Sequence, residues 1–245
     1  MIDAFHLVTA DDVRLVGRRW KHPEPRAAVV LAHGFGASSV EGDVVALAEH
    51  LHRSAFDVVT YDARGHGGSG GTCTLGDLER HDVAAAVAVA ARADTPVVVV
   101  GASMGAIAVL HHAAGRPASV AGLVTVSCPA RWELPRNARG ILSALMTQTA
   151  LGRWIARRHL RVRIAAQLTR PDPPIELVTR VTTPIAVVHG SDDPFIDPSD
   201  AAAIHAAAPE PRRLTVVEEM GHALPEASIE PVQRAIEWVL DLPPD

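Results

Sequence analysis

The chain has 245 residues, enough for one large α/β domain with a small inserted lobe. Its apolar fraction of 48% is ample for a core, and its formal net charge of −5 argues against a general nucleic-acid-binding protein. Two cysteines make no disulfide framework, and the first residues lack the basic and apolar regions of a signal peptide, so we expect a soluble, cytoplasmic protein.

The first part of the chain alternates extended and helical patterns. Two extended runs, 5–8 and 13–20, flank an Asp-rich turn and predict an antiparallel hairpin. The run 27–32 is continuously apolar, which is typical of a strand covered on both faces. Apolar residues at helical spacing predict a helix over 44–51, and a further strand is expected over 56–61.

The same alternation continues to the end of the chain. Strands that alternate with helices indicate a mostly parallel, twisted sheet with helices on both faces. The remaining expected elements are helices at 78–93, 106–114 and 230–240 and strands at 96–100, 122–126, 185–189 and 214–217.

The alternation breaks at residues 131–180, which are helical in pattern over 141–156 and 159–169. Because this stretch falls between two sheet strands, we predict a small helical cap inserted into a core made of 1–130 and 181–245. The stretch holds ten arginines and three acidic residues. The arginines either form the solvated face of a helix or recognise an anionic partner.

Other kinds of site find little support in the sequence. No pair of histidines has the spacing of a common zinc motif, so we expect no metal and no cofactor. The longest apolar stretch, 83–91, is too short to cross a bilayer, so we expect no integral membrane segment.

The pentamer Gly101-Ala102-Ser103-Met104-Gly105 stands between an expected strand and an expected helix. A G-x-S-x-G sequence in that context predicts a nucleophile elbow, a tight turn that exposes the serine hydroxyl at the sheet edge. A chance match is the alternative, and the flanking strand and helix argue against it. Ser103 is therefore the candidate nucleophile.

Acyl transfer by a serine also needs a base and a carboxylate, which should lie at the carboxyl ends of strands. His222 follows the last expected strand in a glycine-containing loop and is the candidate base, whereas His189 fits a structural role better. The loop after the preceding strand offers three aspartates. We favour Asp193 over Asp192 as the acid and expect Asp197 to cap the following helix.

Two backbone amides are the candidates for an oxyanion hole. One is the amide of Met104, the residue after the nucleophile, and the other is the amide of Phe35 in the loop that follows the strand at 27–32. An ordinary glycine turn is the alternative interpretation of that loop.

Together these motifs resemble those of the α/β-hydrolase fold superfamily over nearly the whole chain. The chain is most similar to its serine esterase, lysophospholipase and monoacylglycerol-lipase-like branch. The family pattern also places the acid at Asp193 and the DxRGHG segment beside the site as support. The residues that carry the resemblance are HGFG at 33–36, YDARGHGGS at 61–69, GASMG at 101–105, HGSDDP at 189–194 and MGH at 220–222.

The resemblance implies an α/β-hydrolase fold and hydrolysis of carboxylic esters of small to medium acyl chains through an acyl-enzyme intermediate. A thioesterase acting on coenzyme A or carrier-bound acyl chains is the alternative, and a non-catalytic ligand-binding homologue is a second one. The cap would then set selectivity and meet any anionic carrier or phospholipid. We expect the acyl chain to contact Phe35, Leu142, Leu145, Met146 and Trp154.

Overall fold

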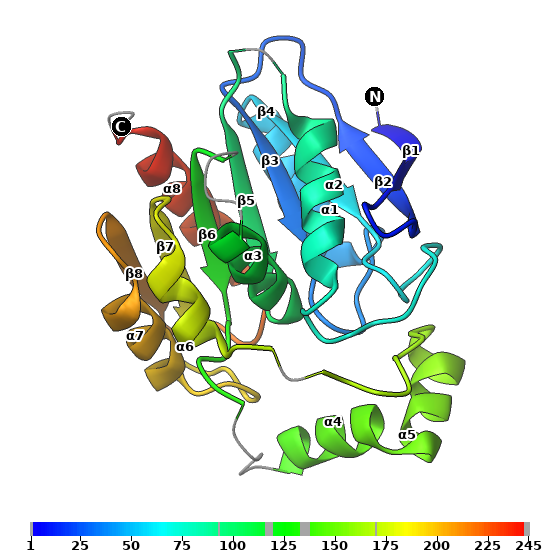
Figure 1. The fold of residues 1–245 in the computed structure, drawn as a ribbon. Helices are drawn as coiled ribbons and strands as arrows, with labels where there is room; N and C mark the ends of the chain where they lie inside the picture. The colour runs from blue at the N-terminus through cyan, green and yellow to red at the C-terminus, as the bar shows by residue number, and fades with distance from the viewer. Residues whose placement is uncertain (1, 93, 116–119, 133–137, 170, 243–245) are drawn as a thin grey trace.

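The computed structural model describes residues 2–92, 94–115, 120–132, 138–169 and 171–242. Its centre is an eight-stranded sheet of order β1-β2-β4-β3-β5-β6-β7-β8 (Figure 1). The first two strands form the predicted antiparallel hairpin, β2 pairs antiparallel with β4, and all other pairs are parallel. The strands are β1 (Ile2–Val8), β2 (Arg14–Trp20), β3 (Ala27–Ala32), β4 (Phe56–Tyr61), β5 (Val97–Ala102), β6 (Gly122–Val126), β7 (Ile185–Gly190) and β8 (Arg212–Val217).

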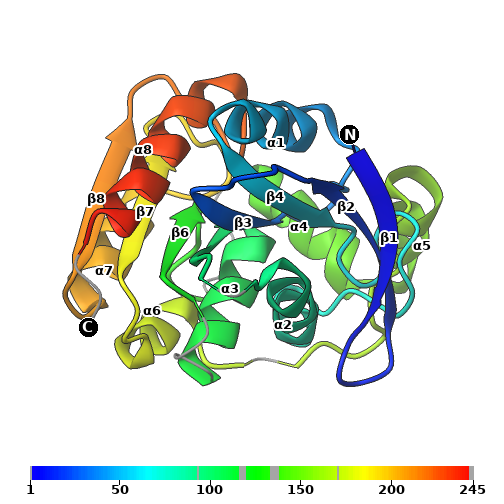
Figure 2. The same ribbon diagram turned by 90° about the horizontal axis from the view of Figure 1, so that it is seen from above.

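Helices cover both faces of the sheet, which explains why the central strands are apolar without alternation. On one face, α1 and α8 pack against side chains such as Val29 and Val124; on the other, α2, α3, α6 and α7 pack against side chains such as Val30 and Val99 (Figure 2). The helices of the two layers are α1 (Gly42–Arg53), α2 (Glu79–Ala90), α3 (Met104–Gly115), α6 (Pro174–Leu177), α7 (Pro198–Ala207) and α8 (Ile229–Leu240), with short helical turns η3 (Val178–Arg180) and η4 (Glu226–Ser228). The predicted α/β-hydrolase fold is confirmed.

Three helical segments, α4 (Ala138–Gln148), α5 (Ala150–Ile155) and η2 (Ala156–Leu160), stand apart from the sheet at the carboxyl ends of its parallel strands (Figure 1). The sequence predicted one helix over 141–156, but Thr149 has extended backbone and its side chain accepts the amide of Gly152, so the helix divides there. Helix α6 also falls within residues 131–180, but it packs against the core. Its Leu177 is buried in the same hydrophobic cluster as the side chains of α3. The division of the chain at 131 and 180 stays a prediction.

The expected helix over 159–169 is wrong beyond Leu160. Arg161 adopts a left-handed φ of 56°, which ends η2, and the following backbone pairs with the loop after β4. The Arg163 amide donates to the carbonyl of Gly65 at 2.8 Å, and the Cys73 amide donates to the carbonyl of Arg163 at 2.7 Å. Gly65 and Cys73 lie 98 and 90 residues before Arg163 in the sequence, and no local pattern indicates a pairing over that separation. Among the described residues, no helix has both the length and the apolar composition needed to cross a bilayer.

Candidate active site

Ser103 occupies the sharp turn between β5 and α3. Its φ of 52° lies in the left-handed region, which a non-glycine residue adopts only under strain. A Cβ on Gly105 would clash with the carbonyl oxygen of Ala32, and one on Gly101 would lie 2.6 Å from the oxygen of Gly105. Only glycine fits at these two positions, so the pentamer forms the tight turn that the sequence predicts.

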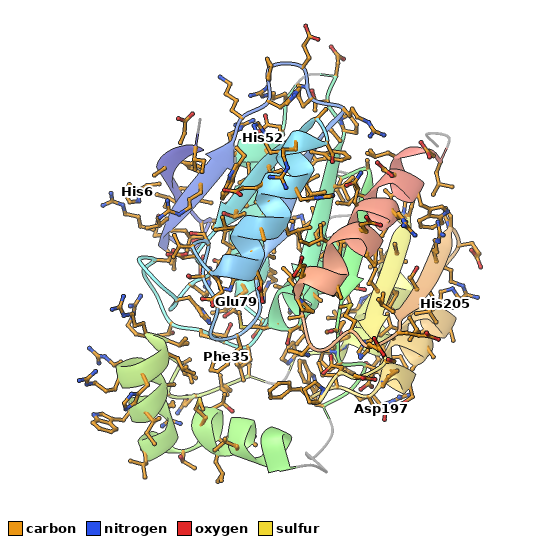
Figure 3. All side chains as sticks on the ribbon, turned by 180° about the vertical axis from the view of Figure 1, so that it is seen from behind. His6, Phe35, His52, Glu79, Asp197 and His205 are labelled. Carbon is orange, nitrogen blue, oxygen red and sulfur yellow. The ribbon has the colours of Figure 1, made fainter. Side chains whose placement is uncertain are left out.

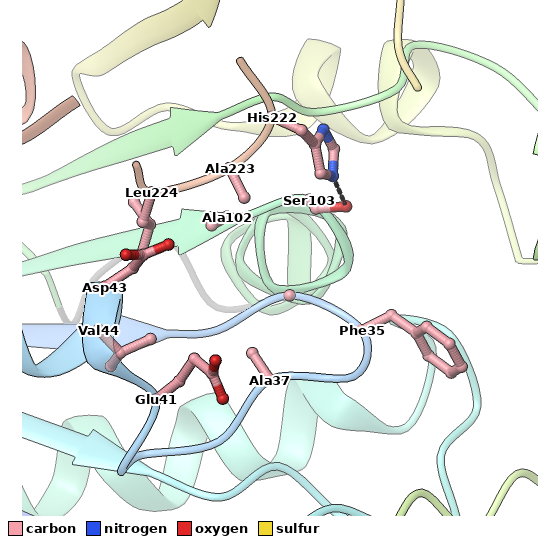
Figure 4. Close-up of a pocket in the computed structure, with 11 residues that line it drawn as sticks. Phe35, Ala37, Glu41, Asp43, Val44, Ala102, Ser103, His222, Ala223 and Leu224 are labelled. Atoms are coloured by element: carbon pink, nitrogen blue, oxygen red, sulfur yellow. Dashed lines mark hydrogen bonds between the residues drawn. The ribbon is translucent and has the colours of Figure 1, made fainter. Parts of the chain in front are cut away.

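The structure brings Ser103, His222 and Asp193 together from three separate loops. The hydroxyl of Ser103 lies 3.0 Å from His222 Nε2, and His222 Nδ1 lies 2.7 Å from Asp193 Oδ2 (Figure 4 shows the first of these contacts). Because an ionised carboxylate can only accept, Nδ1 carries the proton and Nε2 presents its lone pair to the serine. This arrangement lets the imidazole take up the serine proton.

The environment of Asp193 keeps its carboxylate ionised. Burial alone would raise its pKa, but the hydrogen bond and the charge of His222 and the amides of Phe195 and Ile196 hold that pKa below its usual value. Those amides donate to Oδ1 at 2.9 and 3.0 Å, which fixes the carboxyl group while Oδ2 faces the imidazole.

The other candidates of the sequence do not contact Ser103 or His222, although His189 Nε2 lies 3.6 Å from Asp193 Oδ2. Asp192 is exposed and accepts the hydroxyl of Ser191 at 2.9 Å. Asp197 caps α7, as predicted, by accepting the amide of Ser199. His189 is fully buried with Nε2 3.1 Å from the carbonyl oxygen of Ile196, a position that packs the Asp193 loop against β7.

The amides of Phe35 and Met104 both lie beside Ser103. Met104 begins α3, so its amide is one of the unpaired N–H groups at the positive end of a helix dipole. A Cβ on Gly34 would lie 3.3 Å from the Cβ of Ser103, which places the Phe35 loop directly against the serine. Neither amide has an acceptor among the described residues, so both are available to a ligand oxygen.

Two buried histidines hold the Phe35 loop in place. His66 Nε2 accepts the Gly36 amide at 3.3 Å, so its Nδ1–H donates to the carbonyl of Arg64 at 3.0 Å. His33 Nε2 accepts the Ala63 amide at 3.0 Å, and its Nδ1–H donates to the carbonyl of Gly34. Both rings must therefore be neutral, and burial lowers the pKa of each, that of His66 to about 3.

Acidification is therefore expected to destabilise the fold through His66. Between pH 6.5 and pH 3, His66 binds a proton in the unfolded chain but not in the folded one. The free energy of unfolding therefore falls as the pH is lowered through this window. At pH 5 the loss from this residue is about 2 kcal/mol. Urea unfolding of the native chain and His66→Asn at pH 7, 6 and 5 measures it. Equal pH slopes in the two proteins would contradict the assignment.

A pocket opens at Ser103 and contains residues that sequence reasoning missed (Figure 4). Two of them, Glu41 and Asp43, lie at the start of α1, where no sequence motif marks them. In addition, the half-exposed Phe195 ring tilts against His222 with centroids 5.0 Å apart. The lining residues are Gly34, Phe35, Ala37, Glu41, Asp43, Val44, Ala102, Ser103, His222, Ala223 and Leu224.

Of the five residues expected to contact an acyl chain, only Phe35 is among those lining this pocket. Leu142, Leu145 and Trp154 are more than half exposed, and Met146 is partly buried against the core. Figure 3 shows Phe35 on the side of the body that faces α4 and α5. A contact between the four cap residues and an acyl chain stays a prediction.

Comparison with known proteins places this site in context. A family model described as serine aminopeptidase, S33 (Hydrolase_4) matches residues 23–174. The uncharacterised protein Rv2307c of Mycobacterium tuberculosis is 28% identical over 224 residues, which cover 89% of this chain and 71% of that protein. The uncharacterised protein YqkD of Bacillus subtilis is 24% identical over 214 residues, or 83% of this chain and 67% of that protein.

Solved structures share the fold at lower sequence identity. The esterase Pf2001 of Pyrococcus furiosus superposes with a TM-score of 0.73 at 20% identity, covering 98% of this chain and 89% of that one. The esterase RhEst1 of a Rhodococcus species gives a TM-score of 0.69 at 22% identity, covering 98% and 99%. At these identities the likeness establishes the fold.

Proposed function

This chain belongs to the Hydrolase_4 family of α/β hydrolases, described as serine aminopeptidase, S33, and we propose that it is a serine carboxylesterase. Its substrates are carboxylic esters of small to medium acyl chains. The observation that carries the proposal is the continuous hydrogen-bonded chain from Ser103 through His222 to Asp193, with Ser103 and His222 lining a pocket. The esterases among the solved structures of the same fold support it.

In the proposed mechanism, Ser103 Oγ attacks the ester carbonyl carbon while His222 Nε2 takes its proton. The amides of Phe35 and Met104 hold the resulting oxyanion. The imidazolium, stabilised by Asp193, then protonates the leaving alcohol as the carbon–oxygen bond breaks. Water, activated by the same imidazole, hydrolyses the acyl-enzyme and regenerates the serine.

The lining of the pocket supports a substrate with an uncharged acyl group. Next to the nucleophile, the wall includes the small side chains of Ala102 and Ala223 (Figure 4). The two carboxylates, Glu41 and Asp43, are exposed and so lie toward solvent. An uncharged acyl group therefore fits beside Ser103 better than an acid does.

A series of p-nitrophenyl esters of increasing acyl length, set beside matched thioesters, is the test of this proposal. We expect hydrolysis of the acetate or butyrate ester. The rate should depend little on salt, because these esters are uncharged and salt screens no attraction between them and the protein. Preference for thioesters with a steep loss of rate in salt would favour the thioesterase alternative instead. Aminoacyl p-nitroanilides belong in the series because the family model is described as an aminopeptidase.

A further inference from the structure

The helices that stand apart from the sheet carry a concentration of exposed apolar side chains. Half of the twelve large apolar residues that are exposed in the described part of the chain fall within residues 142–160. We call these residues, with the arginines at the end of η2, the cap surface. Its members are Leu142, Leu145, Leu151, Trp154, Ile155, Arg157, Arg158, Leu160 and Arg161.

The packing of α5 decides which way this surface faces. Gly152 and Ala156 are buried and four residues apart, so they share one face. A Cβ on Gly152 would lie 2.5 Å from the Cα of Met146, which shows that this face packs closely against α4. The opposite face presents Leu151 and Trp154, which are 67% and 60% exposed. It is an apolar stripe without a partner among the described residues.

Arginines follow the stripe along the chain. Arg157 and Arg158 lie in η2, directly after α5, and Arg161 follows the end of η2. All three are exposed, and no carboxylate lies within ion-pair distance of them among the described residues. Residues 134–171 contain eight arginines and no aspartate or glutamate, although the chain as a whole carries −5. The positive charge is therefore local.

The cap surface also adjoins the proposed oxyanion loop. A Cβ on Gly36 would lie 3.9 Å from Cδ1 of Leu160, so the end of η2 reaches the loop that carries Phe35. Both α4 and α5 lie at the carboxyl ends of the strands, the same end of the sheet as Ser103 (Figure 1). The end of η2, where the cap surface carries its arginines, thus lies next to a loop that lines the pocket.

We propose that the cap surface docks on an anionic phospholipid surface, from which the pocket receives its ester. That the pocket hydrolyses a lipid ester rests on the proposed function. The docking itself does not depend on it. Trp and Leu enter the boundary between headgroups and acyl chains, and neighbouring arginines bind lipid phosphates. An acidic protein would account for the arginines, but a single projecting apolar helix face with basic residues at its end fits a lipid boundary better.

Vesicle co-sedimentation of the full chain tests the proposal, with Ser103→Ala introduced so that no lipid is hydrolysed. We expect binding to vesicles of phosphatidylcholine with phosphatidylglycerol, weak binding to phosphatidylcholine alone, and release by salt. The triple variant Arg157→Gln/Arg158→Gln/Arg161→Gln should weaken binding on the order of 100-fold, since each arginine near an anionic surface contributes roughly fivefold. The fluorescence of Trp154 should shift to the blue on binding, and Trp154→Phe should remove that shift.

Exposed arginines outside the cap surface give a control for the loss of positive charge elsewhere. Arg180→Gln/Arg234→Gln removes two charges whose carboxylate partners lie at 2.7 and 2.8 Å, and it should bind vesicles like the parent. Absence of binding to anionic vesicles at low salt would overturn the proposal, as would equal binding by the triple variant. Capture of an acidic acyl carrier protein without any vesicle binding would assign the surface to a protein partner instead. None of these readouts depends on catalysis, so failure of the docking and failure of the esterase are separable.

Discussion

Ser103→Ala is expected to lower kcat for p-nitrophenyl butyrate by about 10⁶-fold, to the floor of the assay. The substitution removes the hydroxyl that His222 contacts and that is placed to attack the carbonyl, while the pocket and the amides of Phe35 and Met104 remain. KM should change little because the pocket still binds the ester. Initial rates of purified protein over a substrate range measure both quantities.

The same variant must be shown to fold. Its circular dichroism spectrum and thermal midpoint should match those of the parent, because alanine adds no atoms to the turn between β5 and α3. A folded Ser103→Ala protein with more than a small fraction of parental activity would place the nucleophile elsewhere.

Asp193→Asn is expected to lower kcat by about 10⁴-fold, whereas Asp192→Asn should leave it within a factor of two. An amide in place of the Asp193 carboxylate no longer stabilises the imidazolium and favours the wrong tautomer of His222. Asp192 is the adjacent residue with the same chemistry, but it is exposed and contacts Ser191. The two variants therefore form a matched pair.

Steady-state rates of the two asparagine variants, measured across pH 6 to 9, check this expectation. The loss in Asp193→Asn should be present throughout that range, because the pKa of Asp193 is held below its usual value and the carboxylate is ionised at every pH in it. If Asp192→Asn removed activity and Asp193→Asn did not, the geometry at His222 would not be the one used in catalysis.

Most of the sheet could be predicted from sequence because its signals are local. The uninterrupted apolar run at β3 indicates burial on both faces, and the alternation of strands with helices predicts parallel pairing. The turn at Ser103 could also be predicted from sequence. The backbone on both sides of the serine passes so close to other backbone atoms that only glycine fits at 101 and 105.

The site was predictable to the extent that its residues stand at strand ends in the expected order. Sequence reasoning preferred Asp193 to Asp192, and the structure places Asp193 against His222. It missed Glu41 and Asp43 on the pocket wall because they carry no motif and reach the site only through the position of α1. The tilt of Phe195 over His222 likewise depends on loop geometry.

The conformation of the inserted segment could not be predicted, for a different reason. After Leu160 its conformation is set by pairing with the loop around Gly65 and Cys73, a contact distant in sequence that overrides the helical pattern of 161–169. The exposure of Leu142, Leu145 and Trp154 also could not be read from sequence, because an apolar stripe predicts burial against something without saying what.

Covalent labelling with a fluorophosphonate, followed by peptide mass spectrometry, tests the central claim most directly. The reagent phosphonylates a serine only where a base activates it and amides hold the resulting oxyanion. The account predicts one adduct per chain, on the peptide that contains Ser103, and no adduct in Ser103→Ala or His222→Ala. An unlabelled native protein, or an adduct on another residue, would contradict it.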